Sequence, residues 1–465
     1  MRARFARALA LVFALELTGC AVGPDYARPR VAVPEKFYAE ARAEEARSLA
    51  DVAWWEVFDD PALSALVEEA VKSGFDARLA AARVLEARAR FGIARSALFP
   101  DVDARGGWQR VRPDASVNPD GRTVTLWSAE ATFSWELDVW GRIRRLDEAA
   151  RAAYLAREEA RRGVLLSLAS DVSIAYLELR ELDEELEIAT RTVAAFQDTY
   201  DLFNRRLEGG AASALETERA KASLAQVAAQ IPEIRRAIVA RETQISFLLG
   251  RNPGPIPREK KPILPPPDVP AGLPSALLER RPDIREAEQL LITANAEIGA
   301  AKADFFPRLS LTGLFGNVST ELGDLFSQGK TWSVAAGLLA PLFHGGRIRS
   351  GYQAAQARWE EARVGYEAAV TNAFGEVSRA LVDRTELVET ERERTRAVMA
   401  YQEAVRFANI RYTAGRSAYF EVLEAQQQLF PAEISRAQTR RARLVAVVNL
   451  YRALGGGWSV ASRQE

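Results

Sequence analysis

The two residue types that most often supply nucleophiles, bases and soft metal ligands are almost absent from this chain. Cysteine occurs once, at Cys20, and histidine once, at His344. A single chain therefore cannot form a disulfide, a cysteine metal cluster or a Cys/His dyad, and no other constellation typical of a hydrolase is recognisable. We predict that the protein is not an enzyme and that it has no catalytic site, no metal site and no cofactor.

Cys20 has a different chemistry open to it, which is acylation. Basic residues open the chain, an apolar run covers residues 8–15, and Leu17-Thr18-Gly19 leads directly into Cys20. This order is typical of a bacterial lipoprotein signal. We predict that residues 1–19 are a cleaved signal peptide and that a covalent lipid on Cys20 anchors the mature N-terminus. The alternative is a short N-terminal helix with a buried cysteine.

Charge and hydropathy narrow the class of protein further. Lys and Arg number 62 against 63 Asp and Glu, so no excess of positive charge is available for phosphates, and we predict no nucleic-acid partner. Beyond the leader, no apolar run reaches roughly eighteen residues, so we predict no membrane-spanning helix, although strands escape this test. Residue 21 is Ala rather than Asp, so the usual signal for retention at the inner membrane is missing.

The elements that must position any site occur twice, because the sequence repeats itself at a shift of about 205 residues. We place the two halves at residues 61–250 and 274–457, with a proline-rich linker over 251–273. Residues 20–60 are the lipidated N-terminal segment, and 458–465 form a tail. The landmarks Gly92, Phe99-Pro100, Gly141-Arg142-Ile143-Arg144, Arg206, Gly210 and Glu216 recur as Gly299, Phe306-Pro307, Gly346-Arg347-Ile348-Arg349, Arg411, Gly415 and Glu421.

Each half contains the same series of predicted elements. A first helix, over Pro61–Leu98 or Ser275–Phe305, ends at a Phe-Pro pair. Alternating apolar and polar residues then predict a β-hairpin, over about 102–137 or 308–340. A long helix and a returning helix complete each half, over 141–207 and 213–249 in the first and over 346–412 and 417–454 in the second. Pro232 and Pro431 should bend or divide the returning helices.

The long helices carry a heptad pattern that is typical of a coiled coil. A helix of about 67 residues would be roughly 100 Å long. Four strands cannot close a barrel, whereas three chains would supply twelve and leave an aqueous lumen. The predicted fold class is therefore mostly α with a membrane β part. Duplicated halves each give a β-hairpin and long coiled-coil helices, and the assembly is a trimeric 12-stranded β-barrel plus a periplasmic α-helical barrel.

Short motifs are spread over the whole chain. They are Cys20-Ala21-Val22-Gly23-Pro24-Asp25-Tyr26 with Pro29, Trp54-Trp55, Arg281-Pro282-Asp283-Ile284, Phe305-Phe306-Pro307, Pro341-Leu342-Phe343 with Gly345-Gly346-Arg347, and Arg411-Tyr412 with Gly415. Together they resemble the lipoprotein outer-membrane factors of tripartite efflux systems, the TolC-like proteins of the NodT family. The resemblance implies a homotrimer in the outer membrane that extends into the periplasm. It also implies a periplasmic adaptor (membrane fusion protein) and an inner-membrane RND-type pump as partners, with passive conduction of drugs or other small toxic compounds to the exterior.

The same resemblance implies a periplasmic gate. The matching positions are Arg411 and Tyr412 on the long helix and Glu424 on the returning helix, where other members commonly have Asp. We expect Arg411 to pair with acidic neighbours across helices while the entrance is closed. The alternative is a solvated rim of charges. His344 lies where the family often has an acidic or other polar residue, so we interpret it as a turn residue rather than a metal ligand.

The corners between the long and the returning helices are candidates for contact with the adaptor. They contain Gly209 and Gly210 in the first half, and Ala414, Gly415 and Ser417 in the second. The alternative is that the glycines serve only as helix C-caps, which need no partner.

Two other functions stay open at this stage. Type I secretion systems use similar trimers, so export of peptides or proteins is one alternative. A periplasmic coiled-coil adaptor or scaffold is the other, because it would also be lipidated and helical. Such an adaptor would not need four amphipathic strands.

Overall fold

The computed structural model describes residues 21–38, 58–112, 114, 122–259, 263, 274–327 and 329–456. The predicted signal peptide, Cys20, Trp54-Trp55, most of the linker and the predicted tail lie outside these residues. The chain divides into two compact units, which we describe separately. The sheet unit comprises Met1–Arg30, Arg83–Glu158 and Glu286–Glu367, and the helical unit comprises Val31–Ala82, Glu159–Arg285 and Ala368–Glu465.

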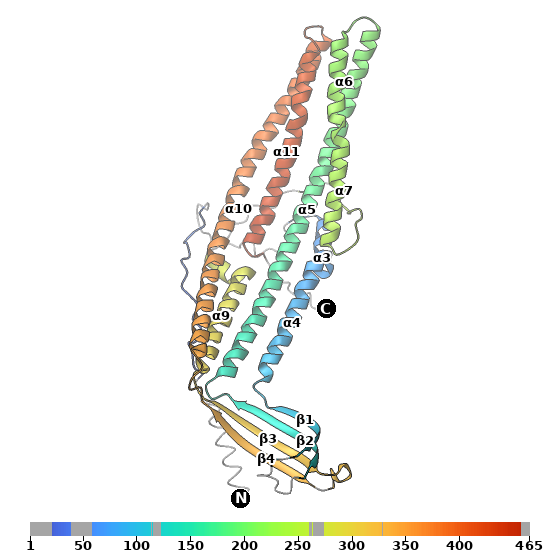
Figure 1. Ribbon diagram of the computed structural model, residues 1–465. Helices are drawn as coiled ribbons and strands as arrows, with labels where there is room; N and C mark the ends of the chain where they lie inside the picture. The colour runs from blue at the N-terminus through green and yellow to red at the C-terminus, as the bar shows by residue number, and fades with distance from the viewer. Residues whose placement is uncertain are drawn as a thin grey trace. The chain divides into compact units, whose positions relative to one another are not determined.

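The sheet unit is built on one four-stranded antiparallel sheet (Figure 1). Its strands are β1 (Asp101–Val111), β2 (Val124–Leu137), β3 (Arg308–Ser319) and β4 (Lys330–Leu339), in that order across the sheet. The two predicted hairpins, β1 with β2 and β3 with β4, are confirmed. In addition, β2 pairs with β3, so the two halves of the chain join in one sheet with β1 and β4 at its edges.

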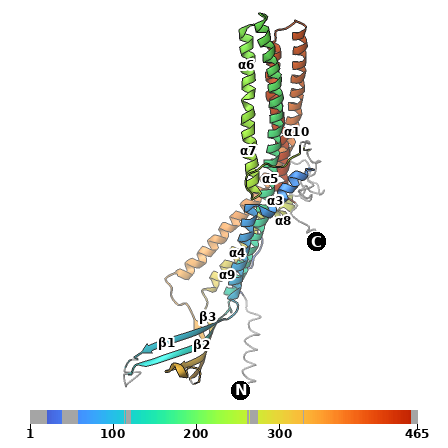
Figure 2. The ribbon, with the colours of Figure 1, turned by 90° about the vertical axis from the view of Figure 1, so that its right-hand side faces the viewer.

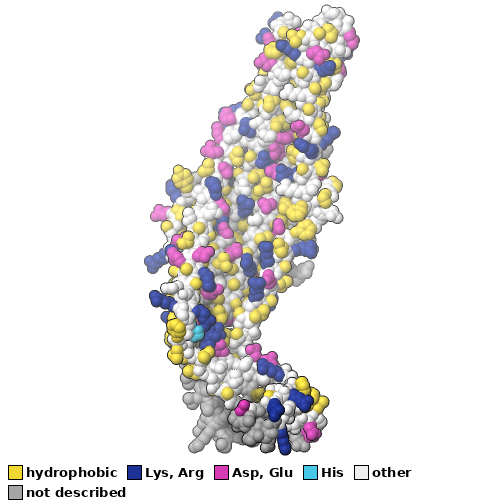
Figure 3. Space-filling view, in the orientation of Figure 1, with side chains coloured by type: hydrophobic (Ala, Val, Ile, Leu, Met, Phe, Trp, Pro, Cys, Tyr) yellow, Lys and Arg dark blue, Asp and Glu magenta, His cyan; other side chains and the backbone are white. Residues whose placement is uncertain are grey.

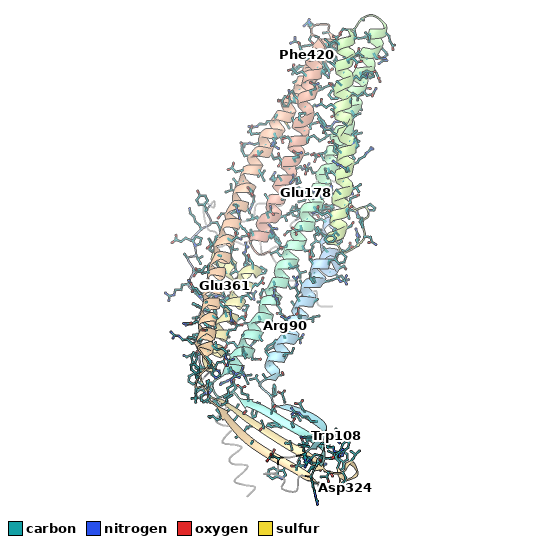
Figure 4. The ribbon with its side chains drawn as sticks, in the orientation of Figure 1. Arg90, Trp108, Glu178, Asp324, Glu361 and Phe420 are labelled. Atoms are coloured by element: carbon teal, nitrogen blue, oxygen red, sulfur yellow. The ribbon has the colours of Figure 1, made fainter. Side chains whose placement is uncertain are left out.

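The strands present large apolar side chains to the outside. Trp332, Val334 and Leu338 alternate along β4 and are exposed to 73%, 76% and 67%. Trp108 on β1 lies opposite Trp127 on β2, with ring centroids 6.2 Å apart, and Figure 4 labels Trp108 near one end of the sheet. None of the helices among the described residues is both long and apolar enough to cross a bilayer.

Helices adjoin the strands at one end of the sheet. α4 (Phe75–Ser96) and α9 (Pro282–Ala303) end shortly before β1 and β3, whereas α5 (Arg142–Glu208) and α10 (Arg347–Thr413) begin shortly after β2 and β4. The Phe-Pro motif of the second half is packed at this junction. The Trp140 ring stacks on Phe306 at 4.7 Å and its Nε1 donates a hydrogen bond to the carbonyl of Pro307 at 2.8 Å.

The helical unit contains two antiparallel helical hairpins (Figure 2). In the first, α5 returns as α6 (Ala214–Ala228) and α7 (Gln230–Leu248), and in the second, α10 returns as α11 (Phe420–Ala453). The predicted heptad seam of α5 is largely buried, because long apolar side chains at this spacing meet on one helix face. Its members with 3% exposure or less are Leu168, Val172, Ala175, Leu179, Ala189, Phe196 and Phe203.

The first helix of each half differs from the single helix predicted from the sequence. In the first half it is two helices, α3 (Pro61–Ser73) and α4, separated at Gly74. In the second half α8 (Leu277–Arg280) and α9 are separated at Arg281, which has an extended backbone because it precedes Pro282. Pro232 lies in the first turn of α7, just after the division from α6, whereas α11 continues through Pro431.

A buried charge anchors each of these starting segments. The Asp60 carboxylate accepts hydrogen bonds from the amides of Ala62 and Leu63 at the start of α3 and from the Tyr176 hydroxyl of α5 at 2.9 Å. In the second half, the Arg281 guanidinium pairs with Asp283 and with Glu376 of α10, and it also donates to the carbonyl of Ala453 at the end of α11. Both side chains are almost fully buried.

Candidate functional site

Both long helices end in the same backbone motif. At the end of α5, Gly210 has φ 70°, its amide donates to the carbonyl of Leu207, and the amide of Ala211 donates to that of Arg206. At the end of α10, Gly415 has φ 68° and the amides of Gly415 and Arg416 make the same two bonds, to Tyr412 and Arg411. These are Schellman caps, in which a left-handed residue favours glycine. Contact of the corners with an adaptor stays a prediction.

The first corner passes into its returning helix through a capping box. The Ser213 hydroxyl accepts a hydrogen bond from the amide of Glu216 at 3.2 Å, and the Glu216 carboxylate accepts one from the amide of Ser213 at 2.9 Å. The hydrogen bonds from Ser213 hold the pKa of the Glu216 carboxyl below its usual value. The start of α6 is therefore satisfied by its own residues.

The second corner lacks this box. The N-cap position of α11 is Tyr419, whose side chain makes no capping hydrogen bond. Ser417 lies at the corner with its hydroxyl buried and without a hydrogen-bond partner in the described part of the chain. The second corner therefore holds a polar group that the chain itself does not satisfy.

Arg411 forms an ion pair across the second hairpin, with an acidic neighbour on α11 other than Glu424. Its Nη2 lies 3.5 Å from Glu421 Oε1, and the two side chains are 57% and 44% exposed. Glu424 lies further along α11, is exposed, and makes no ion pair with any described residue. Exposed pairs of this kind contribute at most about 1 kcal/mol, so this one is a weak fastener within a single chain.

Tyr412 makes the contact that joins the two helical hairpins at their corners. Its hydroxyl accepts a hydrogen bond from Arg206 of α5, whose guanidinium also lies over the Tyr412 ring at 5.1 Å. The Tyr412 ring meets Tyr419 edge to face at 4.9 Å. Tyr412 is thus held by one residue from each hairpin.

Tyr419 extends this contact into the buried seam. The ring of Tyr419 meets the ring of Phe203 edge to face, with centroids 4.8 Å apart, and its hydroxyl lies 2.5 Å from the hydroxyl of Thr199. Phe203 and Thr199 are both on α5. Burial raises the pKa of the Tyr419 phenol above its usual value. Phe420, which follows Tyr419 as the first residue of α11, is labelled in Figure 4. A continuous set of contacts therefore runs from Arg206 through Tyr412 and Tyr419 to Phe203.

The sequence identified two members of this group and missed the others. Arg411 and Tyr412 are brought together with neighbours on both hairpins, whereas Glu424 is not. The residues that were missed are Arg206, Phe203, Thr199, Tyr419 and Glu421. The repeat offered a signal for two of these, because Arg206 and Glu421 are landmarks that the two halves share.

A second candidate feature lies in the sheet unit, where residues Ala21–Arg28 form an N-terminal strap. Two hydrogen bonds hold its backbone. The amide of Val22 donates to the carbonyl of Trp140 at 3.0 Å, and the side chain of Asn295 donates to the carbonyl of Pro24 at 3.0 Å. Gly23 lies between these bonds with φ 114°, and a Cβ on it would be 2.4 Å from the Cα of Gly299. No side chain fits at this crossing.

Charged side chains also attach the strap to α5 and α9. Asp25 pairs with the buried Arg145 of α5 at 2.8 Å. Arg28 makes a bidentate pair with the buried Glu288 of α9, with both contacts at 2.6 Å, and the Tyr26 hydroxyl donates to the same carboxylate. Burial and this carboxylate raise the pKa of the Tyr26 phenol. The residues that directly follow Cys20 are therefore fixed to the strand–helix junction.

Comparison with known proteins shows which protein family the chain matches. The profile of the family described as Outer membrane efflux protein matches residues 66–251 and 273–456, once in each half. The antibiotic efflux pump outer membrane protein ArpC of Pseudomonas putida is 35% identical over 461 residues, which cover 96% of this chain and 94% of that protein. The probable outer membrane lipoprotein SilC of Salmonella typhimurium is 32% identical over 449 residues, covering 95% and 96%. The crystal structure of the open state of the Neisseria gonorrhoeae MtrE outer membrane channel superposes with a TM-score of 0.81 at 32% identity, covering 94% of this chain and 98% of that one.

Proposed function

Since the chain belongs to the outer membrane efflux protein family, we propose that it forms, as a homotrimer, the outer-membrane channel of a tripartite pump. The family places the protein in the outer membrane as a component of an efflux pump, and it is not an enzyme. The trimer, its lipid anchor, its gate, its partners and its substrates are the parts that we propose.

The observation that carries the trimer is the single sheet with two free edges. β1 and β4 lie at the edges of the four-stranded sheet, and neither has a further strand beside it in the described part of the chain. A sheet in lipid cannot leave edge amides and carbonyls unpaired. Pairing β4 of one copy with β1 of the next closes the sheet, and three copies give a 12-stranded barrel that is wide enough for an aqueous lumen.

The strap supports the lipid anchor. Cys20 directly precedes Ala21, and the strap from Ala21 to Arg28 is held at the strand–helix junction by two backbone ties and two ion pairs. A lipid on Cys20 would therefore enter the bilayer close to the base of the strands. SilC, which is described as a lipoprotein, provides the parallel among the relatives.

For partners, we propose a periplasmic adaptor that contacts the corners at Gly209, Gly210, Ala414, Gly415 and Ser417, and an inner-membrane RND-type pump. Gly209, Gly210, Ala414 and Gly415 are all exposed, which leaves both corners accessible to a partner. The exported compounds are drugs or other small toxic molecules, as the antibiotic efflux role named for ArpC suggests.

The gate in this proposal centres on Tyr412. Arg206 of the first hairpin holds Tyr412, and Tyr419 beside it contacts Phe203 of the first hairpin, so opening requires the hairpins to separate at these two contacts. Arg411 and Glu421 add a weaker exposed pair. Glu424, which has no ion pair within the described chain, is available to a cation on a neighbouring copy.

Single-channel conductance of the full-length protein in planar bilayers, combined with its mass by native mass spectrometry, tests the function. We expect discrete conductance steps from a species with three times the mass of the chain. A monomer that never conducts would overturn the proposal.

Variants in the same assay test the gate. Tyr412→Ala should raise the open fraction most, because it removes contacts to both hairpins. The double variants Arg411→Gln/Glu421→Gln and Arg411→Gln/Glu424→Gln should raise it less. Arg406→Gln is the matched control, because Arg406 is on the same helix, is 53% exposed and is paired only with Glu403 among described carboxylates. Equal conductance of Tyr412→Ala and the control would contradict the gate.

A further inference from the structure

The two edges of the four-stranded sheet are related by the duplication of the chain. The landmarks before β1 recur 207 residues later, before β3, and those after β2 recur 205 residues later, after β4. At these shifts the pair of Val102 and Phe133 becomes Leu309 and Leu338, and the second hairpin contains that pair. In an assembly of copies, the contact of β2 with β3 therefore has one counterpart, which is β4 of one copy beside β1 of the next.

The contact of β2 with β3 sets large side chains opposite small ones on its apolar face. Phe315 of β3 lies opposite Ala131 of β2, and Phe133 of β2 lies opposite Gly313 of β3. A Cβ on Gly313 would be 3.7 Å from the Cβ of Phe133, so the Phe133 side chain lies against the glycine. Since residues directly opposite each other on one face are neighbours, a small residue leaves room for the ring beside it.

The same shifts give an equivalent fit between copies. Ala336 of β4 would lie opposite Trp108 of the partner subunit, and Leu338 opposite Gly106 of the partner subunit. Trp108 and Leu338 are 59% and 67% exposed in the single chain, so both have surface to bury. A slip of one residue would set an apolar face against a polar one, and a slip of two would set Trp108 of the partner subunit against Leu338 or Val334. The register given by the duplication keeps each large side chain opposite a small one.

The same relation accounts for an arginine that has no acid in its own chain. Arg142, the first residue of α5, pairs with Glu136 of β2 at 2.8 Å. Its counterpart Arg347, the first residue of α10, donates to Nδ1 of His344 at 3.1 Å and makes no ion pair with the described residues. Figure 3 shows the histidine among Lys or Arg side chains on the surface. The counterpart of Glu136 is Pro341, so the carboxylate that Arg142 uses is missing from the second half.

The first strand of the next copy would supply this carboxylate. Glu136 lies opposite Ser310 in the sheet, and the counterpart of Ser310 on β1 is Asp103. Pro341 would therefore lie opposite Asp103 of the partner subunit. Within its own chain Asp103 is exposed and makes no ion pair with the described residues. The carboxylate is displaced by one strand, which is about 5 Å, and a long arginine side chain can follow it.

We propose that copies of this chain join with β4 antiparallel to β1 in the register that places Ala336 opposite Trp108 of the partner subunit, and that Arg347 pairs with Asp103 of the partner subunit. Packing and charge at the two edges are then completed only by a second copy. This inference rests on the proposed function, because it specifies the contact that closes the barrel.

Disulfide trapping in the full-length protein, in native membranes, tests the register. Two matched pairs of cysteines lie opposite each other between copies, Ala335→Cys with Gln109→Cys and Ser333→Cys with Val111→Cys. Exchanging the partners gives two controls, Ala335→Cys with Val111→Cys and Ser333→Cys with Gln109→Cys, which are opposed only after a slip of two residues. β1 and β4 are at opposite edges of the sheet, so a bond between them joins two copies.

We expect both matched pairs to form covalently linked copies at least about tenfold faster than both controls, because a disulfide needs Cα atoms within about 7 Å of each other. Each cysteine occurs once in a matched pair and once in a control, so effects of the single substitutions on folding cancel. Linking at equal rates, faster linking in the controls or no linking in a trimeric protein would overturn the register.

Charge reversal tests the ion pair. Arg347→Asp and Asp103→Arg should each reduce, by up to about fivefold, the fraction of trimer that survives heating in detergent, because each brings like charges together. Combining them should recover most of the loss, since the swapped charges pair again.

Arg349→Asp is the matched control, because Arg349 is exposed on the same turn of α10 and makes no ion pair with the described residues. Its loss should not be recovered by Asp103→Arg. Equal recovery in the two double variants, or no recovery in either, would overturn the pairing.

Conductance and mass separate this inference from the proposed function. A trimer that conducts but links in a slipped register disproves only the inference. A chain that stays monomeric and never conducts disproves both.

Discussion

The two helical corners share a backbone and differ in their side chains. Each ends its long helix with a left-handed glycine and the same pair of hydrogen bonds. The first corner then satisfies its returning helix through the capping box of Ser213 and Glu216, whereas the second leaves the Ser417 hydroxyl buried and unpaired in the described chain. Backbone geometry is therefore common to the two corners, while the side chains that cap the returning helices are not.

The segments that start the two halves also differ in the side chains that hold them. Asp60 anchors the first half with a buried acid, and Arg281 anchors the second with a buried base. Duplication preserved the left-handed glycine turns that end the long and the returning helices, at Gly210 and Gly415 and at Gly250 and Gly455. The buried charges are not at equivalent positions, so each half has its own means of attaching its first helix to the long helices.

The largest expected effect comes from removing these anchors. Arg281→Ala should lower the free energy of unfolding by about 2–3 kcal/mol, because it leaves the buried carbonyl of Ala453 without its donor and Glu376 with Asn372 alone. Denaturant unfolding followed by circular dichroism measures the loss. Asp60→Ala should give a similar loss in the first half, and a loss under about 1 kcal/mol in either variant would contradict the anchoring role.

A smaller effect should appear in the pH dependence of the stability, through Tyr176, which donates a hydrogen bond to the Asp60 anchor. Burial, together with the Asp60 carboxylate, raises the pKa of Tyr176 from 10.0 to about 12. Since the unfolded chain releases this proton first, the neutral phenol stabilises the fold below pH 10, and that contribution is lost as the pH rises towards 12. The wild-type protein should thus lose up to about 2 kcal/mol over this window more than Tyr176→Phe does. Parallel curves for the two proteins would disprove the link.

The corners should respond in opposite directions to the same substitution. Ser213→Ala removes an N-cap and should destabilise by about 1 kcal/mol. Ser417→Ala removes a hydroxyl that has no partner, so it should be neutral or stabilising by up to about 1 kcal/mol. Thermal unfolding of the two variants makes the comparison. Destabilisation by Ser417→Ala equal to that by Ser213→Ala would show that the second corner is satisfied within the chain.

The smallest expected effect is local. The pKa of Glu216 is lowered in the folded protein, so the capping box contributes above the unfolded pKa and loses its contribution as the pH falls through the folded one. The protection of the first-turn amides of α6 against hydrogen exchange, expressed relative to the slower intrinsic exchange in acid, should therefore fall as the pH is lowered. Ser213→Ala should remove this acid dependence, and its persistence there would assign it to another group.

Much of the fold followed from local patterns. Strand alternation predicted both hairpins, and the heptads predicted the buried seam of α5, because side-chain period reports the face that an element buries. Residue type alone did not reveal the partner of Arg411, because Glu421 and Glu424 lie on the same helix within one turn of each other. The helix breaks at Gly74 and Arg281 were likewise missed, since both lie inside patterns that continue on either side.

The sequence by itself determined the duplication, the four strands, the long helices and the glycine corners, since each depends on residues close together in the chain. Only the tertiary structure showed that the hairpins share one sheet and that Gly23 crosses Gly299. It also showed that Arg206 reaches Tyr412. These facts join residues far apart in sequence, and their proximity depends on packing rather than on any local pattern.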